Sequence, residues 1–468
     1  MESHYKKLFK VVSRPTRAGS RLIVLSAVLV VGITLLVVSA SFFYTDSNVI
    51  TDTSKTIIGQ SNGLTDKISN LWQGSGSHAN IDHEILTYPQ IEDALTFKQT
   101  SDKRRSEIVK DNMEFYHDFF DKEISEPKKG TLARAPAQGA DYDRANATLL
   151  VLVRNEELNQ LLHTIRQIEE HWNSKFHYPY TFVNDQEFSA KFKQSVNAAT
   201  SGKCNFVVIP KEIWDPPANI DMDKLFHEID IMEEQQINYA GKLSYRNMCR
   251  FNSGYFYQLD FLKQFKWYWR FEPGTNYFCD IDYDLFKFME ENDKTYGFVI
   301  SLYDAPQTVE TLWPVTLDYV KKNPQFVHPN GAFKWLTENL QNPWHARATE
   351  GYSTCHFWSN FEIANMDFYR GEAYSGWIKS LEENGGFYYE RWGDAPVHSV
   401  GIGLFEDKDK VHWFRDIGYE HSPYKNCPKS DKCSGCSAGD FGPGSLDDQN
   451  CMSNWIKLEM SNEQLAWY

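Results

Sequence analysis

The chain has 468 residues, a formal net charge of −15 and 15% aromatic residues. An acidic chain lacks the basic face that a nucleic-acid partner needs, so the composition argues against nucleic-acid binding. The length allows one large domain or two moderate ones. The aromatic excess fits either sugar stacking or a large hydrophobic core.

The 23 residues from Leu22 to Tyr44 carry no charge and are mainly Leu, Val, Ile and Ala. As a helix they span about 34 Å, enough to cross a hydrocarbon core of roughly 30 Å. Six Lys and Arg residues but a single Glu precede them. By the positive-inside rule, the sequence predicts a cytoplasmic tail (1–21), a transmembrane signal-anchor helix (22–44) and a translocated remainder. An uncleaved signal or a buried core helix is the alternative.

Residues 45–143 are polar and predict a stem between the anchor and a folded body. Within this region, the apolar spacing from Ser101 to Lys122 predicts a helix. The segment from Gly130 to Ala140 has the composition of a linker. We therefore expect the working domain to occupy residues 144–468.

Short apolar runs alternate with helical patterns after residue 144, which predicts an α/β sheet. The expected strands are 147–153, 180–183, 206–209, 267–271 and 296–302. Ligands in such sheets bind at the carboxyl ends of the strands. Residues that directly follow these strands are therefore the first candidates for a site.

All eight cysteines follow the predicted anchor, and four of them lie in the last 42 residues. An even number in an oxidising compartment favours disulfides, which would hold this Gly- and Ser-rich segment in shape. A zinc knuckle at Cys433 and Cys436 is the less favoured alternative, because no second matched pair is present. A glycosylation sequon at Asn146 abuts the first expected strand.

The segment from Tyr268 to Asp284 carries an unusual number of acids after a strand. Glu272 follows the strand end, and three alternate residues would face one side of an extended segment: Asp280, Asp282 and Asp284. Such a cluster suits a divalent cation held by carboxylates and phosphate oxygens. Capping of the following helix by Asp282 or Asp284 is an equally weighted interpretation.

Three further segments gather polar side chains. Cys355 to Ala364 places Glu362 among aromatic residues, where a carboxylate is costly unless it is paired or functional. Phe387 to Ser399 and Val411 to Pro423 hold Glu390, Arg391, Asp394, His398, His412 and His421. Each single histidine is more often structural than a ligand. HExxH spacing is absent, and no GxSxG elbow between a strand and a helix marks a hydrolase.

Together these segments resemble glycosyltransferase family 15, the fungal α-1,2-mannosyltransferases of the Kre2/Mnt1 type. The blocks that carry the resemblance are 245–257, 268–284, 297–313, 355–377 and 385–399. The similarity runs from about Arg144 to the Cys-rich C-terminal segment. A polar stretch from about Lys321 to Glu350 lies between matching blocks, and would reshape acceptor recognition if it is an insertion.

The resemblance implies a GT-A fold: a single mixed-sheet nucleotide-binding domain with an adjoining acceptor region. It also implies GDP-mannose as donor, Mn²⁺ as cofactor and retention of the anomeric configuration. In this sequence, Glu272 and His421 match the metal-associated positions. Glu362 matches the carboxylate proposed as nucleophile or as stabiliser of the oxocarbenium ion.

Other positions are expected to contact substrate or nucleotide. The resemblance assigns Tyr245 and Asp394 to the active site. Arg154 ends the first strand and is placed to pair with phosphate. Arg250 and Asp282, both within matching blocks, are expected to bind the nucleotide.

The sequence therefore predicts a Golgi single-pass type II enzyme that transfers mannose from GDP-mannose to α-mannoside acceptors on O-linked or N-linked glycans. Within enzymes, mannosylphosphate transfer or another linkage on the same fold is the alternative. From another class, the alternative is a membrane-anchored mannan-binding protein that has lost turnover.

Overall fold

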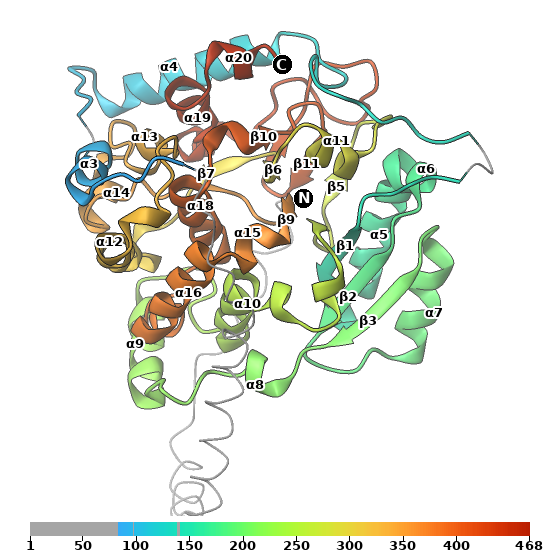
Figure 1. The fold of residues 1–468 in the computed structure, drawn as a ribbon, viewed down its shortest axis with the longest axis horizontal. Helices are drawn as coiled ribbons and strands as arrows, with labels where there is room; N and C mark the ends of the chain where they lie inside the picture. The colour runs from blue at the N-terminus through green and yellow to red at the C-terminus, as the bar shows by residue number, and fades with distance from the viewer. Residues whose placement is uncertain (1–82, 97, 138–140) are drawn as a thin grey trace, which may run out of the picture. The chain divides into compact units, whose positions relative to one another are not determined.

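In the computed structural model, residues 83–96, 98–137 and 141–468 are described, and Figure 1 shows their fold. In this part of the chain the central sheet has seven strands in the order β10-β6-β9-β4-β1-β2-β3. Strands β4, β1, β2 and β3 are mutually parallel, β9 is antiparallel to β4 and β6, and β10 is parallel to β6. The predicted α/β architecture is confirmed, with a mixed sheet.

The strands of the described residues are β1 Ala147–Leu152, β2 Tyr180–Asn184, β3 Cys204–Val208, β4 Trp267–Arg270, β5 Asn276–Tyr277, β6 Tyr296–Phe298, β7 Ser301–Tyr303, β8 Cys355–Phe357, β9 Glu362–Asn365, β10 Val411–Trp413, β11 Tyr419–His421 and β12 Tyr424–Asn426.

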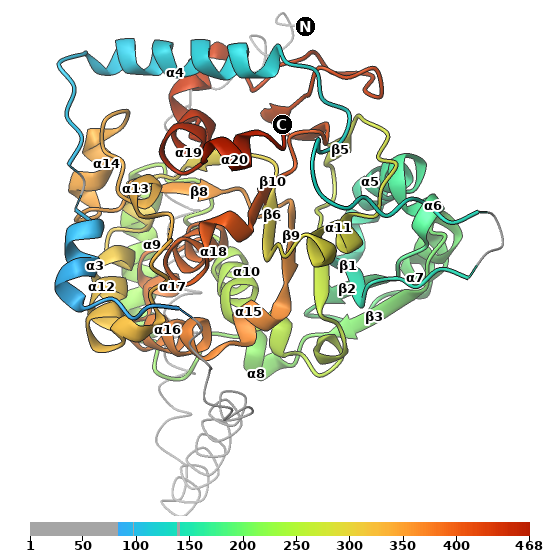
Figure 2. The same ribbon diagram turned by 45° about the horizontal axis from the view of Figure 1, so that its top comes forward.

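Helices cover both faces of this sheet. Figures 1 and 2 show α5, α6 and α7 beside β1, β2 and β3, and α10, α16 and α18 in the other half of the molecule. The helices of the described residues are α3 Tyr88–Ala94, α4 Arg105–Phe120, α5 Leu158–Ile168, α6 Ser174–Phe176, α7 Ala190–Ala199, α8 Lys211–Trp214, α9 Met222–Glu234, α10 Leu243–Gly254, α11 Leu285–Glu291, α12 Leu312–Lys322, α13 Phe333–Leu336, α14 Pro343–Ala348, α15 Met366–Arg370, α16 Glu372–Asn384, α17 Gly386–Tyr389, α18 Asp394–Phe405, α19 Met452–Leu458 and α20 Asn462–Leu465.

The first four expected strands correspond to β1, β2, β3 and β4 within two residues. The fifth, 296–302, is divided into β6 and β7. β6 joins the central sheet, whereas β7 pairs with β8 in a separate two-stranded sheet. A third sheet, β12-β11-β5, brings β11 beside the segment that follows β4. This small sheet is what carries His421 toward the end of the central sheet.

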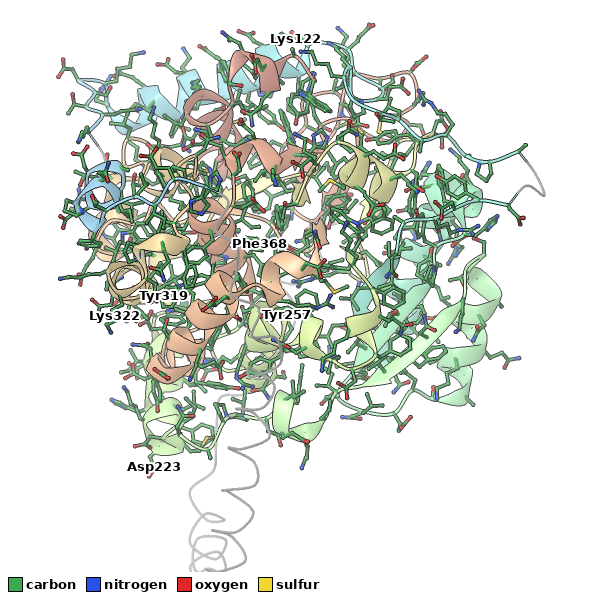
Figure 3. All side chains as sticks on the ribbon, viewed as in Figure 1. Lys122, Asp223, Tyr257, Tyr319, Lys322 and Phe368 are labelled. Carbon is green, nitrogen blue, oxygen red and sulfur yellow. A yellow bond between two sulfur atoms is a disulfide. The ribbon has the colours of Figure 1, made fainter. Side chains whose placement is uncertain are left out.

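Most of the aromatic excess lies in the core. The fully buried tryptophans include Trp172, Trp267, Trp269, Trp313, Trp335, Trp377, Trp392, Trp413 and Trp455. Figure 3 shows charged side chains such as Lys122, Asp223 and Lys322 at the periphery, whereas Tyr257 lies inside. Of the two interpretations of the aromatic content, the large core therefore explains most of it.

The described part of the predicted stem is packed on the body. The helix expected over 101–122 is α4, and it buries Tyr116, Phe119 and Phe120 in the main hydrophobic core. Arg415 Nη2 donates to the carbonyl oxygens of Phe119, at 2.7 Å, and Lys122. The folded body therefore begins well before residue 144, and Figure 2 shows α4 lying along it.

The predicted anchor, residues 22–44, lies outside the described residues. Among those that are described, no helix has both the length and the apolar character needed to span a membrane.

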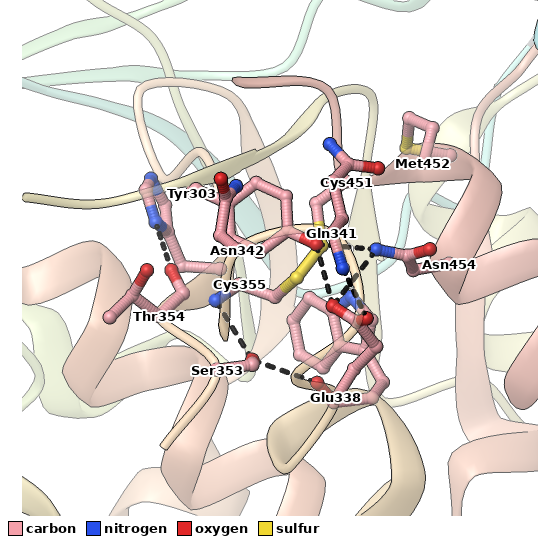
Figure 4. Close-up of a disulfide and its surroundings, with 12 residues drawn as sticks. Tyr303, Glu338, Gln341, Asn342, Ser353, Thr354, Cys355, Cys451, Met452 and Asn454 are labelled. Carbon is pink, nitrogen blue, oxygen red and sulfur yellow. Dashed lines mark hydrogen bonds between the residues drawn. A yellow bond between two sulfur atoms is a disulfide. The ribbon is translucent and has the colours of Figure 1, made fainter. Parts of the chain in front are cut away.

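All eight cysteines are described, and six of them form disulfides: Cys279–Cys433, Cys355–Cys451 and Cys427–Cys436. Cys204 and Cys249 are free. The prediction that disulfides hold the C-terminal segment is confirmed, and the zinc alternative is wrong because Cys433 and Cys436 each bond to another cysteine. Figure 4 shows Cys355–Cys451, which joins β8 to the start of α19.

Candidate active site

Within the described residues, two cavities meet at the end of the central sheet. The strand-end cavity, of about 570 Å³, is lined by Leu152, Val153, Arg154, Asn184 and Asp185, which stand at or just beyond the carboxyl ends of β1 and β2. The α18 cavity, of about 580 Å³, is lined at the start of α18 and along β7 and β8. The two cavities share Tyr239, Tyr245, Met248, Arg270, Glu272 and His421.

Glu272 and His421 lie at the junction of the two cavities. His421 Nε2 is 3.6 Å from Glu272 Oε2, and Arg270 Nη2 donates to Glu272 Oε1 at 2.7 Å. Burial would raise the pKa of Glu272, but the charges of Arg270 and His421 outweigh it and lower the pKa to about 2. The carboxylate is therefore ionised throughout the physiological range.

This pair fits a divalent cation of the Mn²⁺ type. A carboxylate oxygen and an imidazole nitrogen are both ligands that such cations accept. Among the described residues, no group of three or more His, Cys, Asp or Glu side chains is arranged to hold a metal. A cation bound by Glu272 and His421 would therefore need its remaining ligands from a bound molecule.

The three aspartates predicted to converge on a cation do not do so. Asp280 accepts from His171 Nδ1 at 2.8 Å, and Asp282 pairs with Lys175 and Lys432 at 2.8 and 2.9 Å. Asp284 caps α11 by accepting from the backbone of Phe286 and Lys287. The metal interpretation is wrong for this cluster because the segment is not a strand, and the capping interpretation is confirmed for Asp284.

Asp394 faces the α18 cavity as the first residue of α18. Its Oδ2 accepts from Arg270 Nη1 and, at 2.8 Å, from Ser359 Oγ. The helix dipole of α18 favours a negative charge at this end. Arg270 therefore binds two cavity carboxylates: its Nη1 donates to Asp394 and its Nη2 donates to Glu272.

Tyr245 lies on α10 and lines both cavities. Its ring stacks on Tyr239, with the two centroids 4.7 Å apart and the planes at 4°. Burial raises the pKa of Tyr245 well above its usual value, so the hydroxyl stays protonated and can donate a hydrogen bond.

Glu362 lies in a buried network of hydrogen bonds rather than on a cavity wall. It lies on β9, is 0% exposed and lines neither cavity. Its Oε1 accepts from Tyr268 at 2.8 Å, and its Oε2 accepts from Tyr296 and contacts His398 Nδ1, both at 2.9 Å. These partners enclose Glu362 in this structure, and its assignment as nucleophile or as stabiliser of the oxocarbenium ion stays a prediction.

Of the four residues expected to bind nucleotide, Arg154 and Tyr245 line the strand-end cavity, whereas Arg250 and Asp282 do not. Arg154 lines the strand-end cavity and contacts Glu157 at 3.1 Å. Arg250 is buried against Glu382 at 2.8 Å, and Asp282 sits in its lysine pair outside both cavities. The geometry gives both of these side chains structural partners instead.

Several cavity residues were not singled out individually from the sequence. Asp304 directly follows β7, and Trp358 and Asn360 follow β8. Strand-end position is the signal that would have found them, but β7 and β8 were not resolved as separate strands by pattern alone. Arg391 belongs to a segment that the sequence did mark, without a role.

Comparison with known proteins gives a consistent result. The model of the glycolipid 2-alpha-mannosyltransferase family matches residues 106–460, starting within α4. A probable mannosyltransferase of Saccharomyces cerevisiae, KTR4, is 47% identical over 399 residues, which is 83% of this chain and 85% of the relative. The O-glycoside alpha-1,2-mannosyltransferase omh1 of Schizosaccharomyces pombe is 44% identical over 62% of this chain and 72% of the relative.

Two solved structures share the fold. The S. cerevisiae mannosyltransferase Ktr4p in complex with GDP has a TM-score of 0.79 and 45% identity, covering 84% of this chain and 100% of that one. Core-mannan synthase A of Aspergillus fumigatus, in its Mn/GDP form, has a TM-score of 0.71 and 49% identity, covering 73% and 93%. The chain belongs to the glycolipid 2-alpha-mannosyltransferase family, glycosyltransferase family 15, and is therefore a glycosyltransferase.

Proposed function

We propose that the protein transfers mannose from GDP-mannose to an α-mannoside acceptor, forming an α-1,2 linkage with retention of configuration. The observation that carries this proposal is the meeting of two cavities at one carboxylate–imidazole pair, Glu272 and His421. A group-transfer enzyme needs a donor and an acceptor on the two sides of one reacting centre, and this arrangement supplies both.

The strand-end cavity is the proposed donor site of a GT-A domain. It opens beyond the carboxyl ends of parallel strands, where α/β sheets bind nucleotides. Two relatives with this fold have been solved with GDP, one of them in an Mn/GDP form. Arg154, at the end of β1, is placed to approach a phosphate if it leaves Glu157.

Glu272 and His421 would hold Mn²⁺ on the protein side. Such a cation, when bound, supplies positive charge that offsets the diphosphate leaving group. Arg270 fixes the Glu272 carboxylate from the opposite side, so Oε2 is left directed toward His421.

Asp394 is the carboxylate we assign to the reacting sugar. It faces the α18 cavity and, with Glu272, provides negative charge where positive charge develops at the mannose C1. Tyr245 donates a hydrogen bond at the boundary between the cavities. Glu362 positions Asp394 indirectly. It contacts His398 on α18, and Asp394 is the first residue of that helix.

We further propose that residues 22–44 anchor the enzyme as a type II protein in the Golgi membrane, with the body in the lumen. The charge asymmetry around this segment supports that orientation. The three disulfides support an oxidising compartment. Glycans of secretory glycoproteins, O-linked or N-linked, are the corresponding acceptors.

The decisive experiment is transfer of labelled mannose from GDP-mannose to methyl α-mannoside by the full chain in detergent, with Mn²⁺ and with EDTA. NMR of the product should show a manganese-dependent α-1,2-linked disaccharide. Mannosylphosphate in the product would replace this proposal by the phosphate-transfer alternative. Binding of mannan without any GDP binding would establish a non-catalytic binding protein.

A further inference from the structure

His421 lies at the tip of the hairpin that β11 and β12 form. It pairs with Tyr424 in the last register pair before the turn, whereas Tyr419 pairs with Asn426 at the base of the hairpin. Glu272, the other half of the carboxylate–imidazole pair, follows β4 of the central sheet. The distance between the two side chains therefore depends on how the hairpin is oriented against that sheet.

The base of the hairpin is held by the end of α4 and the residues that follow it. Arg415, in the connection from β10 to β11, donates through Nη2 to the carbonyl oxygens of Phe119 and Lys122. Beyond β12, the carbonyl oxygen of Lys429 accepts from the backbone N–H of Ile124 at 3.0 Å. Both ends of the hairpin are therefore attached to one short segment of the chain.

The side chain of Arg415 caps α4. It is 0% exposed, and its guanidinium carbon lies 4.8 Å from the ring centre of Phe119 and 5.3 Å from that of Phe120. Burial lowers the pKa of Arg415 to about 10, which leaves the guanidinium charged in the physiological range. Three ionisable groups act on this pKa in the opposite direction: Tyr116, Asp416 and Tyr468. The carbonyl end of a helix favours a positive charge, and aromatic faces accept a guanidinium.

The backbone around Arg415 is tied to the hairpin. Asn426 Nδ2, on β12, donates to the carbonyl oxygens of Arg415 at 3.2 Å and Ile417 at 2.7 Å. The backbone N–H of Gly418 donates to Cys279 Sγ at 3.1 Å. The connection that precedes β11 is therefore fixed to β12 on one side and to a disulfide-bonded cysteine on the other.

The tip of the hairpin is supported less directly than its base. β5 pairs with β11 at Tyr419 and Glu420, one residue short of His421. The ring of Trp358 contacts that of His421, with the centroids 4.8 Å apart. A tilt of about 5° at the base would move the tip of a strand about 10 Å long by roughly 0.9 Å, which exceeds the roughly 0.5 Å within which a functional side chain must be held.

We propose that Arg415 is a positioning residue for the cation site: by capping α4, it fixes the β11–β12 hairpin and thereby the place of His421 opposite Glu272. This inference rests on the proposed function, because it concerns the cation that the proposed transfer uses. Arg415 lines neither cavity and acts through His421. It also makes α4, which the sequence places in the stem, a part of the catalytic unit.

The test is manganese-dependent binding of GDP by the full chain in detergent, with free Mn²⁺ measured by electron paramagnetic resonance. Arg415→Met keeps the length of the side chain but removes its donors. It should raise the Mn²⁺ concentration for half-maximal GDP binding about 10-fold or more, while the Kd for GDP in EDTA stays within about twofold. Arg415→Lys, which keeps a charged donor but loses the planar face, should fall between the wild type and Arg415→Met.

Arg370→Met is the matched control for lost stability. Arg370 also donates to backbone carbonyl oxygens, those of Tyr257, Leu262 and Phe265, and it lines neither cavity. Its replacement should lower the free energy of unfolding, as Arg415→Met does, but leave the manganese requirement within about twofold of the wild type. Equal shifts in Arg370→Met and Arg415→Met would overturn the inference.

A second variant reaches the same contact from α4. Phe119→Leu removes one aromatic face from the guanidinium and keeps the core apolar, so it should raise the manganese requirement about threefold. Phe115→Leu, one turn earlier on α4, should leave it unchanged. If Arg415→Met does not fold, Arg415→Lys and Phe119→Leu decide the question, and an unchanged manganese requirement in both would overturn the inference.

Mannose transfer by the wild type keeps the two proposals distinguishable. If Arg415→Met shows the shift but the wild type transfers no mannose, the proposed function fails and this inference stands. If the wild type transfers mannose and the manganese requirement of Arg415→Met is unchanged, the inference fails and the proposed function stands. Binding of GDP to the wild type that is independent of Mn²⁺ would overturn both.

Discussion

Two carboxylate clusters beside the central sheet differ in what surrounds them. Glu362 is enclosed, and Tyr268, Tyr296 and His398 contact its two oxygens. Glu272 and Asp394 share one guanidinium and face cavities. Arg270 and Glu362 are register partners on β4 and β9, so the two clusters are neighbours.

The difference shows that access, rather than residue type, separates a structural carboxylate from a chemical one. A fully matched, enclosed carboxylate organises the elements that supply its donors. A carboxylate with oxygens left toward a cavity is available to a ligand.

Replacing Glu362 should chiefly cost stability. Glu362→Ala leaves two tyrosine hydroxyls and an imidazole without their buried acceptor, so the free energy of unfolding should fall by about 3–5 kcal/mol. Urea denaturation of the variant beside the wild type measures this. A Glu362→Ala protein as stable as the wild type but without transfer activity would restore its role as a nucleophile.

Replacing Glu272 should chiefly cost activity. Glu272→Gln keeps the size of the side chain but removes the charge at the cavity junction, and transfer should fall by about 10²–10³-fold. The unfolding free energy should change much less than in Glu362→Ala. A manganese titration of GDP binding checks the cause: an unchanged titration would remove Glu272 from the cation site.

Asp416 tests what an incompletely matched buried carboxylate does. Its Oδ1 has no partner among the described residues, although Oδ2 accepts from Tyr283, and burial raises the pKa of Asp416 to about 6. The pKa of Asp416 is higher in the folded protein than the value near 3.8 of the unfolded chain. The contribution of protonated Asp416 to the free energy of unfolding is therefore complete below pH 3.8 and is lost as the pH rises through 6. Since one pKa unit is worth about 1.4 kcal/mol, Asp416→Asn should stabilise the protein by up to about 3 kcal/mol at pH 7 and not at all near pH 3.5. A gain that is equal at both pH values would contradict this explanation.

Tyr303 contacts a buried carboxylate and also lines the α18 cavity, so its replacement should have a small effect on stability and little effect on binding. Its hydroxyl donates to Glu338 at 2.7 Å beside the Cys355–Cys451 disulfide, and its ring lines the α18 cavity (Figure 4). Tyr303→Phe should lower the free energy of unfolding by about 1 kcal/mol. The Kd for methyl α-mannoside should stay near the wild-type value, because the ring remains; a large change in that Kd would show that the hydroxyl itself contacts the ligand.

The contact between Tyr303 and Glu338 also bears on the polar stretch from about Lys321 to Glu350. This stretch contributes Glu338, which holds a cavity residue from behind, rather than lining the cavity directly. This stretch can therefore influence acceptor recognition only through β7 and β8, which line the α18 cavity.

Local pattern was enough for the sheet and for part of the site. Apolar runs such as 147–153 became β1 because burial on both faces of a parallel strand requires continuous apolar sequence. Glu272 and Arg154 were found because they directly follow strands. Residues such as Arg250 and Asp282 share motif blocks with site residues but point elsewhere, and no local signal separates the two outcomes.

The sequence by itself determined β1, β2, β3 and β4, the helix α4, the disulfide-bearing C-terminal segment and the acid after β4, since each depends on neighbours along the chain. Only the tertiary structure decided that Glu362 is enclosed, that His421 reaches Glu272 from a small separate sheet and that α4 joins the body. Those outcomes depend on which distant side chains share a space. Burial and pairing are set by packing across the fold, and they decide which carboxylates remain open to a substrate.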